Sequence, residues 1–258
     1  MTLLGLDDLR VTYRLPGRGQ LNAVDGVSFD LEPRQVLGLV GESGCGKSTL
    51  ARAVCGLVPI SGGSISFNGR PVVSLGLRRR DPALMRIQMV FQNPFASLNP
   101  RRTIGSQIED GLRVNPQRDA WTVGDLLEHV ELEATSRTRF PHQFSGGQRQ
   151  RVAIARAIAA GPELLIGDEP IASLDASLQA RIAILMRNLA VETGAALLFI
   201  SHDLSVVRVI ADDVAVMSAG RIVERGPVER VWIAPEDPYT RRLLAAIPAV
   251  DGLGVLPG

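Results

Sequence analysis

Residues 41–49 read Gly41-Glu42-Ser43-Gly44-Cys45-Gly46-Lys47-Ser48-Thr49. This matches a loop pattern in which glycines let backbone N–H groups turn inward around phosphate oxygens. The apolar residues 36–40 predict a buried strand before the loop, and residues 50–57 predict a helix after it whose N-terminus faces the anion. We expect Lys47 to reach the β- and γ-phosphates of a nucleotide and the Ser48 hydroxyl to ligate Mg²⁺. Strand, loop and helix in this order predict an α/β fold.

Lys47 is the only lysine in the chain, and the other 27 of the 28 basic residues are arginines. A planar guanidinium is a poor substitute for a compact ammonium inside a tight phosphate-binding loop. The one position that keeps lysine is therefore the position where the loop pattern needs it.

The bulk composition narrows the class of protein. The chain has 258 residues, 45% of them hydrophobic, which is typical of a folded α/β domain. A net charge of +1 gives no overall field that favours nucleic acid. No run approaches the roughly 18 apolar residues that span a bilayer. Cys45 and Cys55 have neither disulfide-framework nor metal-ligand spacing, so we expect reduced thiols in the cytosol.

The first 40 residues predict short strands with alternating polar and apolar side chains. Tyr13 lies in one of them, upstream of the phosphate-binding loop. Its ring is placed to stack on an adenine, or it is a half-buried aromatic of the strand, and the sequence leaves both interpretations open.

Residues 93–160 predict a helical insertion in the α/β core, with helical spacing at 104–112 and 123–132. The insertion contains Phe144-Ser145-Gly146-Gly147-Gln148, followed directly by a helix. A Ser-Gly-Gly sequence at a helix N-terminus is a second anion site. Either the chain binds two phosphate groups, or this second site serves the nucleotide of another chain.

Polar residues follow three further apolar strands. Asp168 and Glu169 end the apolar run that begins at Leu164. Adjacent side chains on a strand point to opposite faces, so one acid could face Mg²⁺ and the other could face the attacking water as general base. Gln92 follows residues 87–91 and is placed to touch Mg²⁺ or that water. His202 follows residues 195–201, at the strand end where open α/β sheets bind ligands.

These motifs together resemble the ATP-binding subunits of ABC transporters over nearly the whole chain. The adenine-stacking aromatic corresponds to Tyr13, the Walker A loop to Gly41 to Thr49, and the Q-loop glutamine to Gln92. The signature corresponds to Phe144 to Gln148, and the Walker B aspartate with its catalytic glutamate to Asp168 and Glu169. The D-loop corresponds to Ser173-Leu174-Asp175 and the switch histidine to His202. The D-loop departs from the family's usual Thr-Ser-Ala-Leu-Asp, because Ile171-Ala172 precedes Ser173, but Asp175 remains.

Finer motifs are similar to the ATPases of oligopeptide, dipeptide and nickel importers. They are the run from Gln92 to Arg101, the run from Phe144 to Arg151, and Pro235 to Thr240 with Leu243-Leu244 in the C-terminal extension at about 227–258. Residues 44–50 are more like the second, or "F", of the two paralogous ATPases. The extension lacks cysteines, so the iron–sulfur cluster of some relatives is not expected.

The resemblance implies one ABC ATPase domain over residues 1–258. Its P-loop NTPase core has a parallel sheet, an N-terminal antiparallel β subdomain and an inserted α-helical subdomain at about 93–160. It implies a head-to-tail dimer with a second ATPase, for which the subfamily favours a paralogue, while the sequence leaves a dimer of identical chains open. It also implies two membrane permease subunits and, indirectly, an extracytoplasmic solute-binding protein, but no nucleic acid. The expected location is peripheral, at the cytoplasmic face of the cell membrane.

The resemblance also implies roles for named residues. Catalysis is expected from Glu169, His202 and Gln92, and Mg²⁺ ligation from Ser48, Gln92 and Asp168. ATP is expected to contact Tyr13, Gly41, Ser43, Gly44, Cys45, Gly46, Lys47, Ser48, Thr49, and, across the dimer, Ser145, Gly146, Gly147, Gln148 and Asp175.

The implied function is ATP hydrolysis that powers import of oligopeptides, dipeptides or a similar small solute. One alternative is a soluble ABC-type ATPase in a non-transport assembly, such as the accessory ATPase of the carbon–phosphorus lyase complex. Another is an ABC protein that acts on nucleic acid, but such proteins usually carry long coiled-coil insertions or two ATPase units. The C-terminal extension favours transport, while the sequence does not identify the cargo.

Overall fold

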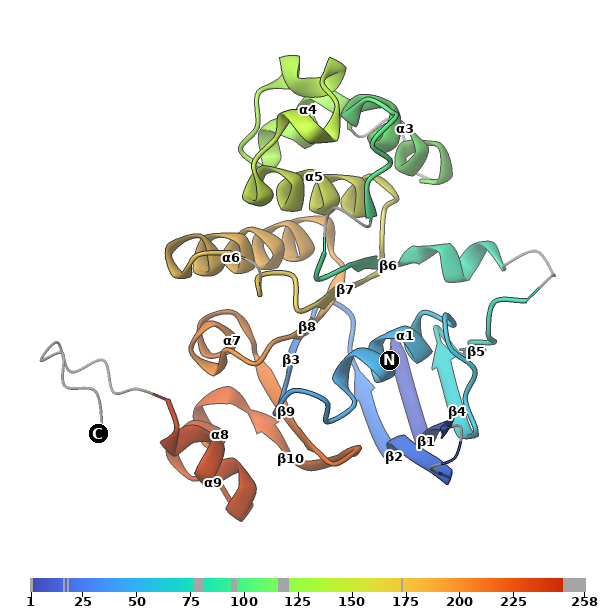
Figure 1. The fold of residues 1–258 in the computed structure, drawn as a ribbon, viewed down its shortest axis with the longest axis vertical. Helices are drawn as coiled ribbons and strands as arrows, with labels where there is room; N and C mark the ends of the chain where they lie inside the picture. Colours follow the sequence, from blue (N-terminus) through green and yellow to red (C-terminus); the bar gives the residue numbers. More distant parts are fainter. Residues whose placement is uncertain are drawn as a thin grey trace, which may run out of the picture.

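The structure is a computed structural model, and it describes residues 2–15, 17, 19–76, 81–93, 97–115, 121–172 and 174–247. Its strands form two sheets, and helices cover them (Figure 1). The larger sheet has the strand order β10-β9-β3-β8-β7-β6, and the smaller has the order β2-β1-β4-β5. The predicted α/β class, with a parallel core sheet and an N-terminal antiparallel sheet, is confirmed.

The larger sheet is parallel except for β10, which pairs antiparallel with β9. Every residue of β3, β7 and β8 is buried. Continuous apolar runs of this kind are typical of parallel strands that are covered on both faces. The strands are β3 (Val36–Val40), β6 (Ile87–Val90), β7 (Leu164–Asp168), β8 (Ala196–Ile200), β9 (Asp213–Ser218) and β10 (Arg221–Pro227).

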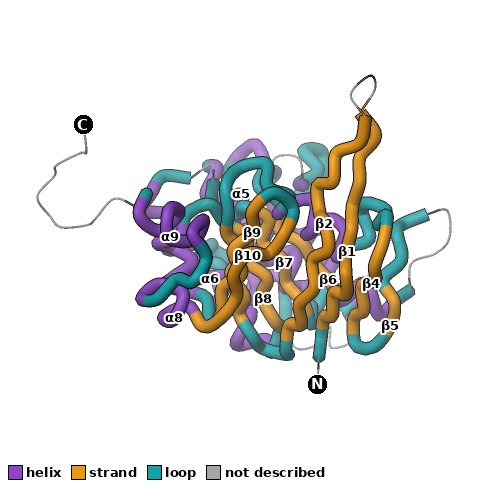
Figure 2. The backbone as a smooth tube through the Cα atoms, turned by 90° about the horizontal axis from the view of Figure 1, so that it is seen from below, coloured by secondary structure: helices purple, strands orange, loops and turns teal. Residues whose placement is uncertain are grey.

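The smaller sheet is antiparallel, and its β1–β2 hairpin extends beyond the neighbouring strands (Figure 2). The β4–β5 turn is Asn68-Gly69, with φ of 50° and 71°. Positive φ at both central residues is what a two-residue type I′ hairpin turn requires, and Asn-Gly is a sequence that favours it. The strands are β1 (Leu4–Leu15), β2 (Gly19–Leu31), β4 (Gly62–Phe67) and β5 (Arg70–Pro71).

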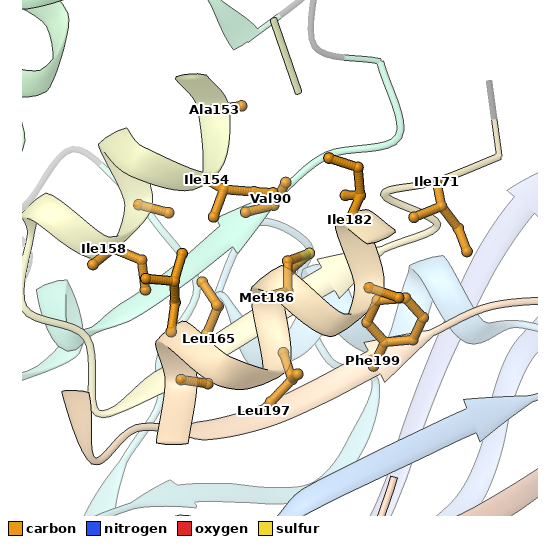
Figure 3. Packing of buried hydrophobic residues seen from close by; sticks show 14 of the residues in the cluster. Val90, Ala153, Ile154, Ile158, Leu165, Ile171, Ile182, Met186, Leu197 and Phe199 are labelled. Atoms are coloured by element: carbon orange, nitrogen blue, oxygen red, sulfur yellow. The ribbon is translucent and has the colours of Figure 1, made fainter. Parts of the chain in front are cut away.

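Helix α1 (Lys47–Val54) follows β3, and α6 (Ala176–Thr193) and α7 (Leu204–Ile210) follow β7 and β8. Figure 3 shows Met186 of α6 above Leu165 and Leu197 of the sheet, with Ile154 and Ile158 beside it. All five side chains are buried. This apolar contact between helices and sheet fixes β7 and β8, whose carboxyl ends carry the polar residues of interest.

The helices between β6 and β7 lie above the larger sheet in Figure 1. They are α3 (Ile104–Val114), α4 (Val123–His129) and α5 (Gly146–Ala159), with short 3₁₀ turns η1 (Pro82–Arg86), η3 (Ala134–Thr138) and η4 (Pro141–Gln143) nearby in the chain. Helix α4 ends three residues before the predicted position 132, because Glu131 has a φ of 56° that a right-handed helix excludes.

Two short helices end the described part of the chain, α8 (Val228–Ile233) and α9 (Pro238–Ala245). They pack beside β9 and β10 (Figures 1 and 2). The boundaries of the helical subdomain and of the C-terminal extension stay predictions, and residues 94–96 and 248–258 of those segments lie outside the described residues. Among the helices that are described, none combines the length and apolar character needed to cross a membrane.

Candidate nucleotide-binding site

The loop at residues 41–49 joins β3 to α1 and lies directly against other strands. Gly46, the residue before α1, has a φ of 112°. A Cβ at Gly46 would overlap the backbone oxygen of Ala23 in β2, and one at Gly41 would overlap the backbone oxygen of Met217 in β9. Two of the glycines in the motif are therefore required by close packing of the loop.

Lys47 is buried, with 3% of its side chain exposed. Its ammonium donates hydrogen bonds to the backbone oxygens of Gly41 at 2.8 Å and Glu42 at 2.9 Å. It also lies 3.9 Å from a carboxylate oxygen of Glu169. The lysine is thus folded back over its own loop, where a compact cation fits better than a guanidinium.

Asp168 is the last residue of β7 and is buried. The Ser48 hydroxyl donates a hydrogen bond of 2.6 Å to its carboxylate. Burial raises the pKa of the Asp168 carboxyl, although this hydrogen bond and the charges of Arg52 and Lys47 act in the opposite direction. A hydroxyl and a carboxylate oxygen in contact are the hard donors that Mg²⁺ prefers, so these residues fit that metal.

Glu169 lies outside β7, so the expectation that strand alternation would aim it was wrong. Its backbone has a φ of 47°, in the left-handed region, so the alternation of an extended strand does not set the direction of its side chain. The carboxylate lies 3.7 Å from a ring nitrogen of His202 and accepts a 3.4 Å hydrogen bond from the Gln92 amide. Gln92 and His202, each at a strand end, and Lys47 of the loop thus surround the Glu169 carboxylate.

A cavity of about 310 Å³ opens beside the loop. Tyr13 lies at its edge with 36% of its surface exposed, which fits a ring available for stacking better than a ring packed in the sheet. Gly41 and Cys45 are buried and do not belong to this lining. The lining residues are Tyr13, Leu21, Ala23, Ser43, Gly44, Gly46, Lys47, Ser48, Thr49, Gln92 and Glu169.

Leu21 and Ala23 were missed by the sequence analysis. Leu21 is directly opposite Tyr13 in the β1–β2 ladder. The alternation of β2 alone does not distinguish an exposed leucine at a ligand cavity from any other exposed leucine. Only the register of the hairpin could have identified these residues.

The predicted second anion site lies away from this cavity. Ser145 caps α5, its hydroxyl accepts the Gln148 backbone N–H at 3.3 Å, and the Gln148 side chain accepts the Ser145 backbone N–H at 3.0 Å. Gly147 is buried against Leu178 of α6. Figure 1 shows α5 and α1 in different parts of the molecule. Ser145 and Gly146 are exposed, and none of residues 145–148 lines the cavity beside the loop.

Asp175 caps α6, and its carboxylate accepts the Leu178 backbone N–H at 3.0 Å. It is exposed and, like the signature residues, is not part of the cavity lining. Its neighbour Ser173 lies outside the described residues.

Comparisons with known proteins identify the family to which this arrangement belongs. The profile described as ABC transporter matches residues 24–172, more than half of the chain. The oligopeptide transport ATP-binding protein OppF of Bacillus subtilis is 45% identical, and the match covers 96% of this chain and 83% of that protein. The chain belongs to the ABC transporter family.

Other ABC proteins agree with this membership. The glutathione import ATP-binding protein GsiA of Escherichia coli is 48% identical over 90% of this chain, but the chain spans only 38% of GsiA. The solved structure of cbiO1 from Clostridium perfringens, part of the ABC transporter complex cbiONQ, is 27% identical with a TM-score of 0.75, and covers 96% of both chains. The ATP-binding cassette MJ0796, dimeric and bound to ADP and Pi, is 25% identical with a TM-score of 0.74, covering 87% of this chain and 98% of that one.

The ABC ATPase fold and the resemblance noted in the sequence are therefore confirmed. As an ABC ATPase, the chain binds ATP and hydrolyses it to drive transport. The roles of individual residues stay predictions, which the geometry above makes specific.

Proposed function

We propose that this ABC subunit powers the import of oligopeptides, or of a small solute of similar chemistry, through membrane permeases. The observation that carries the proposal is the 45% identity to OppF over nearly the whole chain. GsiA, named for import of glutathione, a tripeptide, supports the same class of cargo. The alternative of a non-transport assembly has no comparable support.

In this proposal, the loop binds the phosphates of ATP through Ser43, Gly44, Cys45, Gly46, Lys47 and Thr49. Ser48, Asp168 and Gln92 hold Mg²⁺, which neutralises phosphate charge when it is bound. Glu169 orients the attacking water and takes up its proton, and His202 contacts the γ-phosphate. The convergence of Lys47, Gln92 and His202 on Glu169 supports these roles, since phosphoryl transfer depends on positioning more than on covalent chemistry.

The signature residues Ser145 to Gln148 are proposed to serve the nucleotide of a second, paralogous ATPase in a head-to-tail dimer. Ser145 and Gly146 are exposed at the start of α5, and none of the four residues lines the cavity of their own chain, which supports a role toward a partner. The exposed Asp175 would contribute to the same interface. Two ATP molecules would then lie between the subunits, and their hydrolysis would open the dimer.

A groove of about 480 Å³ between β6 and α3 is the proposed contact with the permeases. Its lining combines apolar side chains with the Arg102–Asp110 ion pair, which suits an amphipathic segment of a membrane subunit. Phe91, adjacent to Gln92, lines the groove, so the groove and the nucleotide cavity meet at consecutive residues. The apolar lining residues include Leu57, Met85, Met89, Phe91 and Val114. This contact would hold the subunit at the cytoplasmic face of the membrane.

Glu169→Gln tests the catalytic assignment. The amide keeps the size of the side chain but cannot take up a proton, so we expect near-normal ATP affinity, hydrolysis reduced at least about 100-fold, and a dimer that persists with ATP. ATP titration, phosphate release and size-exclusion chromatography measure the three quantities. Normal turnover by the variant would remove Glu169 from the mechanism.

The same variant tests the partners. Tagged Glu169→Gln protein would be purified from native membranes with ATP and Mg²⁺, and the proteins that accompany it identified by mass spectrometry. Recovery of two multi-span permeases and a second ATPase supports the import proposal. Recovery of soluble enzymes alone contradicts transport while leaving the ATPase chemistry in place.

A further inference from the structure

The phosphate-binding loop is in direct contact with the C-terminal extension. The backbone N–H of Glu42, the second residue of the loop, donates a 3.0 Å hydrogen bond to the phenol oxygen of Tyr239, 197 residues further along the chain. Tyr239 is the second residue of α9 and does not line the nucleotide cavity. It therefore contacts the backbone of the loop without contributing to the cavity.

The same peptide group is held at its other end by Lys47. The Gly41 carbonyl accepts a 2.8 Å hydrogen bond from the Lys47 ammonium, while the Glu42 N–H of that peptide bond points to Tyr239. Because a peptide group is planar, fixing the direction of its N–H also fixes the direction of its C=O. Tyr239 thereby restrains the orientation of the Gly41 carbonyl, which accepts the hydrogen bond from the Lys47 ammonium.

Tyr239 is held in place by the elements around it. The buried carboxylate of Glu224 in β10 accepts the backbone N–H groups of Glu236 at 2.9 Å and Asp237 at 3.1 Å, immediately before α9. The Asp237 side chain accepts the Tyr239 N–H at 2.7 Å. The Tyr239 side chain packs against the main hydrophobic core. The phenol is thus positioned independently of the loop.

The turn between β9 and β10 also supports the loop. The Gly220 N–H donates a 2.9 Å hydrogen bond to the Cys45 carbonyl, which ties the loop to the residues between β9 and β10. Burial raises the pKa of Tyr239, so the phenol is neutral at physiological pH and keeps its proton. A neutral phenol accepts the Glu42 N–H and still has a proton to donate.

We propose that Tyr239 is a positioning residue for the ATP site, which orients the Gly41–Glu42 peptide group and, through it, the Lys47 ammonium before nucleotide binds. The inference rests on the proposed role of residues 41–49 as the phosphate-binding loop. It makes the C-terminal extension a structural part of nucleotide binding. A loop that is already ordered loses less conformational freedom when ATP binds, and the benefit appears as affinity.

Tyr239→Phe in the full-length chain tests this inference, because it removes the acceptor and keeps the ring. With ATP and Mg²⁺ as ligand in calorimetric titrations, we expect the Kd to rise about 2- to 10-fold, with kcat at saturating ATP close to wild type. Amide exchange of Glu42, followed by NMR without nucleotide, should accelerate at least about 10-fold. Arg242→Ala is the matched control, an exposed side chain on the same helix, and should change none of these quantities.

A higher Kd together with faster Glu42 exchange supports the inference, and either change without the other overturns it. Lys47→Ala, measured in parallel, separates this outcome from failure of the loop assignment: normal ATP binding by that variant would remove the phosphate-binding role itself. If Tyr239→Phe does not fold, Glu224→Gln releases the start of α9 while keeping the phenol. The same paired change in Kd and Glu42 exchange is then expected, and its absence overturns the inference.

Discussion

Single residues in the phosphate-binding loop are fixed by the space around them as much as by their chemistry. Gly44 and Gly46 both have left-handed backbones, with φ of 81° and 112°. Around Gly44, a Cβ would find open space, whereas at Gly46 it would overlap the Ala23 carbonyl oxygen and crowd the Met217 methyl group. Gly44 is therefore required by its backbone conformation alone, whereas Gly46 is required by its conformation and by the lack of space for a side chain.

This difference predicts unequal effects of alanine at the two positions. Gly44→Ala carries the cost of a left-handed alanine, about 1–2 kcal/mol of unfolding free energy. Gly46→Ala adds the overlap with β2, so we expect a total loss of roughly 2–5 kcal/mol. Urea denaturation of both variants measures the difference, and equal losses would show that packing against β2 does not select the glycine.

At the scale of elements, the last strand and the last helix are joined through one buried charge. Glu224 of β10 has 3% of its side chain exposed, accepts two backbone N–H groups from the segment before α9, and lies 3.6 Å from Arg230. Burial acts to raise the pKa of this carboxyl, but the two backbone hydrogen bonds and Arg230 outweigh it and lower the pKa below its usual value. The carboxylate form is therefore the one that holds α9.

A lowered folded-state pKa gives the sign of a pH dependence. The contribution of Glu224 to stability is fully present above the unfolded-state pKa of about 4.3 and is lost as the pH falls through the folded-state value. Glu224→Gln should cost about 1.5–3 kcal/mol at pH 7, the strength of hydrogen bonds to a charged group. Urea denaturation from pH 7 to pH 3 should show this difference shrinking, and a constant difference would contradict the assignment.

For the whole molecule, the fold separates three surfaces and connects two of them directly. The nucleotide cavity lies at the loop, the signature lies at the start of α5, and the groove lies between β6 and α3. Phe91 and Gln92, the two residues that follow β6, line the groove and the cavity respectively. A partner protein that displaces the residues lining the groove would therefore also affect Gln92, whose amide donates a hydrogen bond to Glu169.

Val114 tests whether this groove binds the permeases. It lines the groove with 44% of its surface exposed, so Val114→Asp adds a charge there without burying one. We expect unchanged ATP affinity for the isolated chain and at least a 10-fold loss of permeases recovered in the purification from membranes. Val209→Asp, exposed on α7 away from the groove, is the control and should recover them fully. Full recovery with Val114→Asp would exclude this groove as the contact.

Much of this molecule follows from local sequence. The Gly-rich loop between β3 and α1 and the apolar strands β7 and β8 were predicted, because a loop motif and an apolar segment can both be recognised from consecutive side chains. The single lysine likewise identified its own site, since the chain uses arginine everywhere else.

Other features depended on segments that are far apart in the chain. Strand alternation suggested opposite directions for Asp168 and Glu169, but Glu169 follows the strand with a left-handed backbone to which that alternation does not apply. Leu21 reaches the cavity through the register of β1 with β2, and Tyr239 reaches the loop because Glu224 anchors α9. Sequence alone determined the family's motifs and the order of the strands and helices. Tertiary structure decided which of these residues meet, because register and packing between distant elements leave no periodic signal within either segment.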